Sequence, residues 1–171
     1  IAVGGYLWIG LNPLFTNFEG LNALRSVDDG IKIVYNESLN SFSGLGFFNT
    51  IENELYVENN DALENFEGFE YLNTINGNLT IYDNDNLDNL SGLDQLTLIS
   101  GYLWIATNQS FRTTSGMDQL TAINGDLAID NNQAFIGLSS LESLTSINGY
   151  IQITNNQHLS SLIGLDNIDP L

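Results

Sequence analysis

Hydrophobic residues recur along the whole chain with a period of 24 residues. When each unit is numbered from 1 to 24, starting at Ile1, positions 3, 7, 9, 15, 18, 21 and 24 are apolar, and Thr114 is the one exception among them. The units span 1–24, 25–48, 49–72, 73–96, 97–120, 121–144 and 145–168, and 169–171 remain as a terminal remnant. Because no insertion interrupts this register, we expect a single repeat domain.

The spacing within a unit predicts its local structure. Positions 7 and 9 alternate with variable residues at 6, 8 and 10, which is the period of a β-strand, and position 9 is β-branched in every unit. Positions 15, 18, 21 and 24 lie three residues apart, which favours a return path of turns or short 3₁₀ segments. Position 20 is glycine in every unit except the sixth, where Ser140 stands, and this indicates a bend with positive φ or a close approach between coils.

Repetition of one short unit favours a stacked architecture. A single unit cannot bury its apolar residues, whereas stacked units bury them against one another. The strands then form a parallel sheet with neighbours ~4.8 Å apart. The sequence therefore predicts an all-β fold, a right-handed parallel β-solenoid of seven 24-residue coils.

Position 12 is asparagine in every unit. These amides can form a row that binds a ligand, or a structural ladder in which each side chain bonds backbone groups of neighbouring coils. An unpaired buried polar group costs ~1–3 kcal/mol, so a ladder satisfied within the protein is the favoured interpretation. Its members are Asn12, Asn36, Asn60, Asn84, Asn108, Asn132 and Asn156.

The full spacing resembles a known family. Residues 75–96 read I-x-G-x-L-x-I-x-x-N-x-x-L-x-x-L-x-G-L-x-x-L, which resembles the receptor L domain, a relative of leucine-rich repeats. Similar repeats occur in insulin- and epidermal-growth-factor-receptor ectodomains, fungal cell-wall proteins and bacterial surface proteins. The resemblance implies a β-solenoid with a binding role outside the cell. The lack of cysteine, the regular coils and the acidity look more like a bacterial surface or adhesin module than like the animal receptors.

Charge and composition exclude several classes of function. The chain has 21 acidic residues against Arg25, Lys32 and Arg112, a net charge of −18 that repels nucleic acid and anionic membranes. Without cysteine there are no disulfides or thiolate metal sites. No apolar run approaches the ~18 residues that span a bilayer, so membrane insertion is not expected. Because the chain starts at Ile1 and shows no signal peptide, we interpret it as a mature product or a piece of a longer protein.

The outward strand positions 6, 8 and 10 carry the main candidate site. In the fourth unit, for example, they are Asn78, Thr80 and Tyr82. Aromatic residues here suit a sugar or a protein partner, although cross-strand pairing or burial beneath a neighbouring domain also explains them. The aromatic residues are Tyr6, Trp8, Tyr56, Tyr82, Tyr102, Trp104 and Tyr150.

Acidic residues offer only weak metal sites. Position 22 is acidic in the last five units, which indicates a solvated edge more than calcium binding. The weak calcium candidates in this row are Asp94, Asp118, Glu142 and Asp166. Residues 83–88 resemble the start of an EF-hand loop, but Leu87 and Asp88 stand where a ligand and a glycine are needed. We expect no cofactor.

Catalytic signatures are weak. The single histidine, His158, has no evident acid–base partner. The same-face pairs Glu54/Glu58 and Asp126/Asp130 lie ~13 Å apart along a strand, beyond the ~5–9.5 Å of glycosidase pairs. We therefore expect a protein that is not an enzyme.

These observations favour an extracellular or cell-surface recognition or adhesion module that binds a protein or carbohydrate through the aromatic face. The alternative is a structural spacer, or a repeat that self-associates end to end through its open edges. Ice binding is a third class, and it is disfavoured because no strand position is uniformly threonine.

Overall fold

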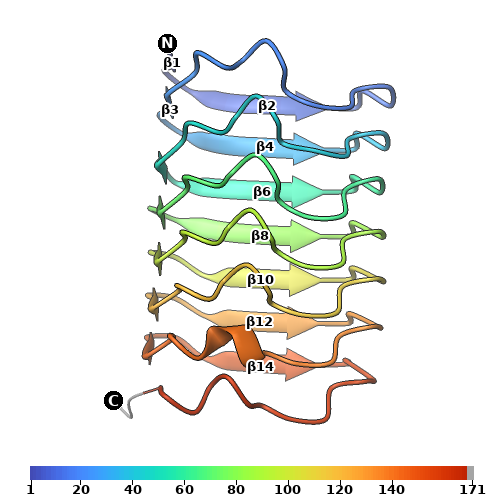
Figure 1. The fold of residues 1–171 in the computed structure, drawn as a ribbon, viewed down its shortest axis with the longest axis vertical. Helices are drawn as coiled ribbons and strands as arrows, with labels where there is room; N and C mark the ends of the chain where they lie inside the picture. The colour runs from blue at the N-terminus through green and yellow to red at the C-terminus, as the bar shows by residue number, and fades with distance from the viewer. Residues whose placement is uncertain (169–171) are drawn as a thin grey trace.

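The chain folds into a single stack of coils. The computed structural model describes residues 1–168, and the predicted remnant 169–171 lies outside them. In Figure 1 each strand runs from left to right, and the chain then returns across the side nearest the viewer to a strand one level lower. This path makes the coil right-handed and places the two termini at opposite ends of the stack. The predicted right-handed β-solenoid is confirmed.

The main sheet is parallel throughout and contains one strand from each unit. Neighbouring strands pair with a constant offset of 24 residues, as Leu55 with Leu79 and Leu79 with Leu103 show. The strand order is therefore the order of the units in the sequence. The strands are β2 (Tyr6–Gly10), β4 (Gly30–Val34), β6 (Glu54–Glu58), β8 (Asn78–Tyr82), β10 (Leu103–Ala106), β12 (Leu127–Asp130) and β14 (Ile151–Thr154).

Short strands at positions 2 and 3 form further parallel pairings that sequence reasoning missed. Two residues give too little alternation to show a period, so only the apolar residue at position 3 was visible. β1 and β3 pair with each other, and β5, β7, β9, β11 and β13 form a five-stranded sheet. The strands are β1 (Ala2–Val3), β3 (Ser26–Val27), β5 (Thr50–Ile51), β7 (Thr74–Ile75), β9 (Leu98–Ile99), β11 (Ala122–Ile123) and β13 (Ser146–Ile147).

The return path consists of successive tight turns, as the spacing of three predicts. Leu93 N–H donates to Leu90 O at 3.0 Å, and Leu96 N–H donates to Leu93 O at 2.9 Å. Each turn places an apolar side chain in the core, which runs through the stack between the strands and the returns. The position-20 glycines take positive φ; at Gly116 φ is 101°, and a Cβ would lie 2.1 Å from Leu90 O.

The two residues that break the repeat lie together. Ser140, at the position of the glycine column, falls in the one 3₁₀ helix of the described residues, η1 (Ser139–Leu141). Thr114, the polar residue in an apolar column, is fully buried. Its Oγ1 lies 2.6 Å from Ser140 Oγ, so each exception satisfies the hydrogen-bonding need of the other.

Candidate functional site

The asparagine column is bonded entirely within the protein. Asn60 Nδ2 donates to Ile33 O at 3.0 Å and to Glu58 O at 2.9 Å. Its Oδ1 accepts the N–H of Asn36 at 3.2 Å, and the same pattern continues at Asn84. The asparagines of units 2 to 6 are buried, so their amides support the corner of each coil and offer no free group to a ligand.

The outer face of the main sheet carries the aromatic residues. Trp8 is 70% exposed and Tyr150 60% exposed, whereas Trp104 is 37% exposed. Tyr6 is also exposed. The remaining three, Tyr56, Tyr82 and Tyr102, are half-buried. All seven therefore lie on one surface, although the centre of that surface is better covered than its two ends.

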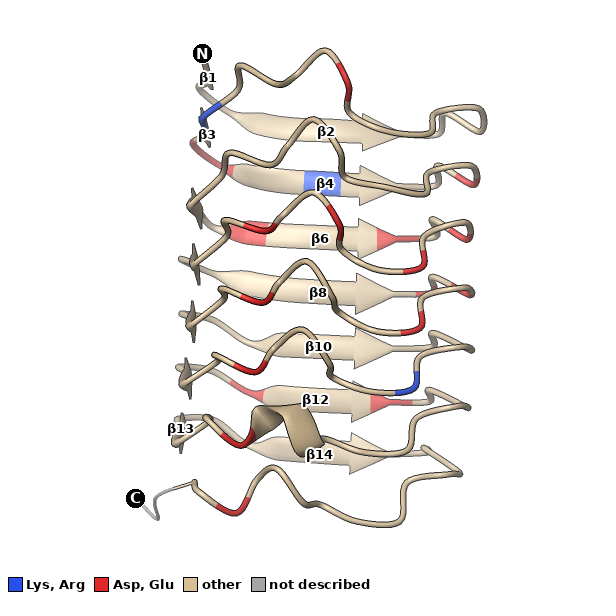
Figure 2. Ribbon diagram, viewed as in Figure 1, with Lys and Arg blue, Asp and Glu red and all other residues tan. Residues whose placement is uncertain are grey.

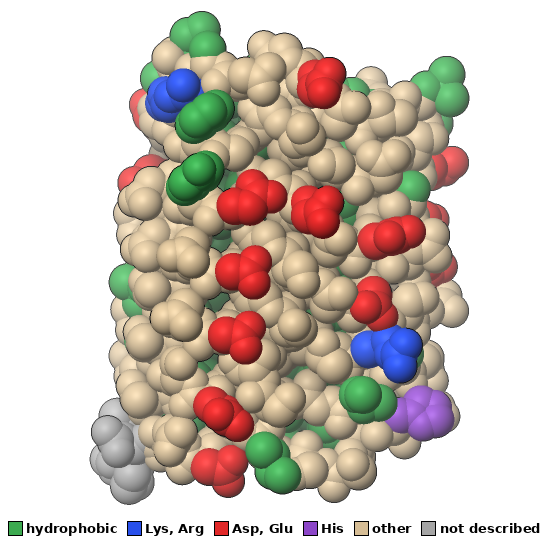
Figure 3. All heavy atoms as spheres, in the orientation of Figure 1, with side chains coloured by type: hydrophobic (Ala, Val, Ile, Leu, Met, Phe, Trp, Pro, Cys, Tyr) green, Lys and Arg blue, Asp and Glu red, His purple; other side chains and the backbone are tan. Residues whose placement is uncertain are grey.

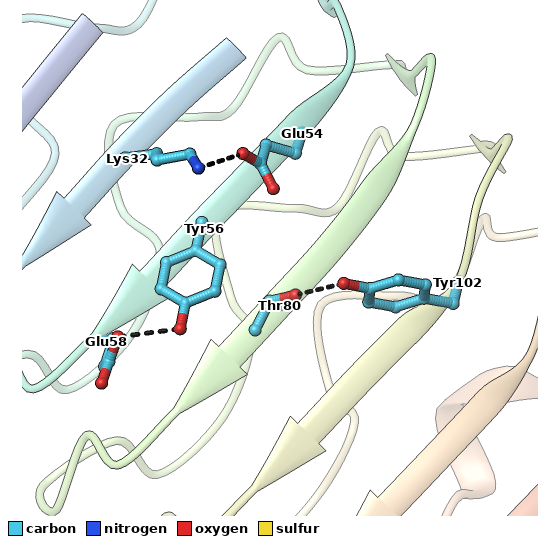
Figure 4. Close-up of polar contacts among 6 residues, drawn as sticks. All are labelled: Lys32, Glu54, Tyr56, Glu58, Thr80 and Tyr102. Atoms are coloured by element: carbon cyan, nitrogen blue, oxygen red, sulfur yellow. Dashed lines mark hydrogen bonds and ion pairs between the residues drawn. The ribbon is translucent and has the colours of Figure 1, made fainter. Parts of the chain in front are cut away.

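Thr80 departs from the expectation that positions 6, 8 and 10 are all exposed. It is on the outer face of β8 yet only 1% exposed. The hydroxyl of Tyr102 lies 3.5 Å from Thr80 Oγ1 (Figure 4). Beside this contact, the ring centroids of Tyr82 and Trp104 are 5.6 Å apart. Large neighbours on β8 itself and on the adjacent coil thus cover the small threonine, which alternation along a single strand cannot reveal.

In the N-terminal half of this face, Lys32 occupies the space between Tyr6 and Glu54. Its Nζ lies 2.7 Å from Glu54 Oε1, with the rings of Tyr6 and Tyr56 centred 4.8 and 5.9 Å away. Hydrogen bonding to Glu54 raises the pKa of the Lys32 ammonium, against the opposing effect of burial. Figure 4 shows this pair beside a second contact on β6, in which Tyr56 donates to Glu58 Oε2 at 2.8 Å.

A hollow occupies the corresponding place in the C-terminal half. It has a volume of about 350 Å³ and lies across β12, with Ala128 at its floor. Trp104 lines one side and Tyr150 the other. The rows that carry them are two strand spacings apart, about 9.6 Å. Asp126 and Asp130 line the hollow from the two ends of β12, which Figure 2 shows in red.

Both aspartates use one oxygen inside the protein. Asp126 Oδ1 accepts the N–H of Tyr150 at 2.9 Å. Asp130 Oδ1 accepts from Thr154 Oγ1 and from Asn155 Nδ2, the latter at 2.9 Å. Within residues 1–168 neither Oδ2 makes a hydrogen bond, so each carboxylate keeps an oxygen that can accept from a ligand.

The acidic residues at position 22 have a structural partner. Figure 3 shows a column of acidic side chains down the return side of the solenoid. Asp94 accepts the N–H of Gly92 at 2.8 Å, and Asp118 and Asp166 accept from the glycines of their own units at 3.2 and 3.1 Å. Glu142 instead follows η1. These carboxylates therefore hold the glycine bend, and the described residues contain no group of three potential metal ligands.

The sequence offers three other acidic or catalytic candidates. In the segment resembling an EF-hand, burial and the charges of Asp61 and Asp83 raise the pKa of Asp85, whose Oδ1 has no hydrogen-bond partner in the described structure. His158 is exposed. Glu54 binds Lys32 and Glu58 binds Tyr56, so neither is a free catalytic carboxylate.

The return side carries one feature that sequence reasoning missed. Phe47 and Tyr71 are exposed and stacked, with ring centroids 6.5 Å apart and an interplanar angle of 2°. The Arg25 guanidinium lies 4.1 Å from the centre of the Phe47 ring. The signal was the aromatic residue at position 23 in two successive units.

Residues 73–136 match the family model described as Receptor L domain. The chain is similar to receptor L domains. These are ligand-binding modules without catalytic activity that generally bind proteins and act outside cells. Comparison with curated proteins and with solved structures found no match. No helix within residues 1–168 is long and apolar enough to cross a membrane.

Proposed function

We propose that this chain is an extracellular recognition or adhesion module of a bacterial surface protein, which binds a protein or carbohydrate partner through the outer face of its main sheet. The observation that carries the proposal is the exposed aromatic surface at the two ends of that face. Trp8 and Tyr150 expose most of their area to solvent, although neither is needed to fill the core. Exposed aromatic residues beside carboxylates are typical of binding surfaces.

Stabilisation of the sheet explains the aromatic residues in the middle of this face, but not those at its ends. Tyr82 with Trp104 and Tyr102 with Thr80 are cross-strand contacts of the kind that strengthen a sheet. Trp8 and Tyr150 make no ring–ring contact within residues 1–168, so cross-strand aromatic pairing does not account for them. The hollow between Trp104 and Tyr150 adds a concave element to the surface.

The similarity to receptor L domains supports the same assignment, because these modules bind ligands without catalysis. It favours a protein over a carbohydrate as the partner, since the family generally binds protein ligands. The charge of −18 further favours a partner whose contact surface is basic.

Binding of the folded chain to arrays of extracellular proteins and glycans tests the proposal. We expect Trp104→Ala to abolish binding of any array ligand that the parent chain captures, because it removes the largest side chain beside the hollow. The matched control is Tyr71→Ala, which removes an exposed aromatic residue from the return side. Binding that survives Trp104→Ala, or that is lost equally in Tyr71→Ala, would contradict the proposal.

Self-association is a second candidate, favoured by apolar residues at both ends of the stack. Ile151 and Leu162, at the core positions 7 and 18 of the last coil, are 47% and 55% exposed, and Ile1 in the first coil is 81% exposed. Further coils or a second copy can cover such residues. Sedimentation velocity over a hundredfold concentration range tests self-association, and a monomer throughout would exclude it at those concentrations.

A further inference from the structure

Two regions of the outer face begin with nearly the same sequence. Residues 5–9 and residues 101–105 both read Gly-Tyr-Leu-Trp-Ile. The next strand along the sheet differs: Lys32 pairs with Trp8, whereas Ala128 pairs with Trp104. The same aromatic pair is thus followed by a lysine in one region and by a small residue in the other.

In the region around residues 5–9, Lys32 shows that the outer face can hold an ammonium group. Its ammonium lies between the Tyr6 ring and the Glu54 carboxylate, both at position 6 of their units. A cation beside an aromatic face and a carboxylate gains from both contacts. Here the chain itself supplies the cation.

The second region holds the same kinds of group without a cation. Position 6 of three successive coils reads Tyr102, Asp126 and Tyr150, so a carboxylate lies between two aromatic residues. All three line the hollow. No ion pair to Asp126 exists within residues 1–168, and Figure 2 shows acidic residues at both ends of β12.

We propose that the hollow over Ala128 binds the primary ammonium of a lysine side chain from a protein partner. The inference rests on the proposed function, because it names the chemistry recognised on the same face. The alkyl stem of that lysine lies over Ala128 against Trp104, where the stem of Lys32 lies beside Trp8 in the other region. Its ammonium binds Asp126 Oδ2 between Tyr102 and Tyr150.

The charge of the protein favours this occupant over a neutral sugar. The chain carries −18, so a cation is drawn to its surface from solution. Asp126 directly precedes β12 and Asp130 is its last residue, and an incoming ammonium reduces their mutual repulsion. The hollow of about 350 Å³ is at the lower end of the ~300–1,000 Å³ typical of ligand sites, which suits one side chain.

The direct test uses a small lysine probe and nuclear magnetic resonance. Nα-acetyl-lysine methylamide is titrated into the ¹⁵N-labelled chain, and its Nζ-acetylated form serves as the neutral control. We expect the indole N–H signal of Trp104 to shift and saturate with the charged probe, while the Trp8 signal stays in place because Lys32 fills that site. The neutral probe should bind at least about tenfold more weakly, since it lacks the charge. Equal binding of the two probes would overturn the proposal.

Two variants that each remove one charge locate the site. Asp126→Asn removes the charge but keeps the acceptor for Tyr150 N–H, as Asn78 already does for Tyr102 N–H at 3.1 Å. We expect it to weaken binding about tenfold, whereas Asp94→Asn, which removes one charge from the return side, should change it less than about twofold. An equal effect of both variants would show only nonspecific attraction to the acidic surface and would overturn the proposal.

The test is completed by exchanging the residues that pair with the two tryptophans, which are Ala128 beside Trp104 and Lys32 beside Trp8. Ala128→Lys should fill the hollow with the chain's own lysine and abolish the Trp104 shift. Lys32→Ala should open a second site and cause the Trp8 signal to shift as well. Retained binding in a folded Ala128→Lys chain would overturn the proposal.

Failure of this inference is distinguishable from failure of the proposed function. An array ligand that is lost in Trp104→Ala but unaffected by Asp126→Asn and Ala128→Lys would uphold the binding face and overturn the lysine site. A saturable Trp104 shift that Ala128→Lys abolishes, together with array ligands insensitive to Trp104→Ala, would uphold the ammonium pocket and overturn the proposed function.

Discussion

The two ends of the outer sheet face are built on the same scaffold but differ in whether their site is filled. Near β4, Lys32 binds Glu54 and the face is occupied by the chain's own side chain. Near β12, Ala128 leaves a hollow between Trp104 and Tyr150. Because every coil repeats the same backbone register, a change at one outward position alters the surface without altering the fold.

This comparison shows where function lies in a regular solenoid. The repeated positions are occupied by the core and the asparagine ladder, which satisfy the same packing needs in every coil. The outward positions have no such common requirement, so they are free to differ. Variable residues within a strict repeat are therefore the first place to search for a binding site.

The largest effect should come from comparing the two tryptophans. Trp104→Ala should lower the free energy of unfolding by about 2 kcal/mol, because its side chain packs on Tyr82 and is 37% exposed, about half as exposed as Trp8. Trp8→Ala should cost less than about 1 kcal/mol, since Trp8 is 70% exposed. Urea denaturation followed by circular dichroism measures both values. Equal losses would contradict the difference in burial between the two regions.

A smaller effect is expected at Tyr56. Tyr56→Phe removes the 2.8 Å hydrogen bond to Glu58 and should cost about 1 kcal/mol. Burial, with the bond to Glu58, raises the pKa of Tyr56, so its phenol should stay protonated where exposed tyrosines ionise. Ultraviolet titration of the parent and the variant tests this. A variant that loses one tyrosine from the phase near pH 10 would contradict it.

Replacement of Lys32 tests how much this lysine stabilises the N-terminal region of the face, because its contribution to the free energy of unfolding depends on pH. The pKa of Lys32 is raised above its usual 10.5 in the folded chain, so its stabilising contribution is present below that pH and is lost as pH rises through the folded-state pKa. Lys32→Met should therefore cost about 0.5 kcal/mol at pH 7, a small value because the pair is partly exposed to solvent.

The matched control for Lys32 is Arg112→Met, which breaks a looser pair with Asp88 at 3.9 Å. Its cost at pH 7 should be close to zero. Urea denaturation at pH 7 and at pH 11 separates the two variants. A cost for Lys32→Met that grows at pH 11 would contradict the assigned role of the ammonium.

The smallest effect is expected at Thr80. Thr80→Val keeps the shape of a residue that is 1% exposed and removes only a 3.5 Å hydrogen bond to Tyr102. The free energy of unfolding should change by less than about 0.5 kcal/mol. Thermal denaturation measures it, with Thr80→Ala as the control that removes volume. A large loss in Thr80→Val would show that the hydroxyl, and not the covering by neighbours, matters there.

The sequence predicted most of the architecture because the same signal was repeated in each unit. Strands at positions 6 to 10, the bend at position 20 and the stacking order all follow from columns of identical or similar residues, such as Gly68 and Gly92. The two-residue strands, which are the odd-numbered strands from β1 to β13, were missed because two residues carry no period. Ser140 and Thr114 stood out as exceptions, but their mutual bond could not be read from the sequence.

The candidate site was predicted only as a list of aromatic positions. The sequence by itself determined that Trp8 and Trp104 lie on the outer face, because strand alternation sets the side to which each points. Only the tertiary structure decided that Thr80 is covered, that Lys32 fills one region and that Ala128 leaves a hollow in another. These outcomes depend on the sizes and rotamers of side chains on neighbouring coils, which are 24 residues apart and become neighbours only when the chain is wound.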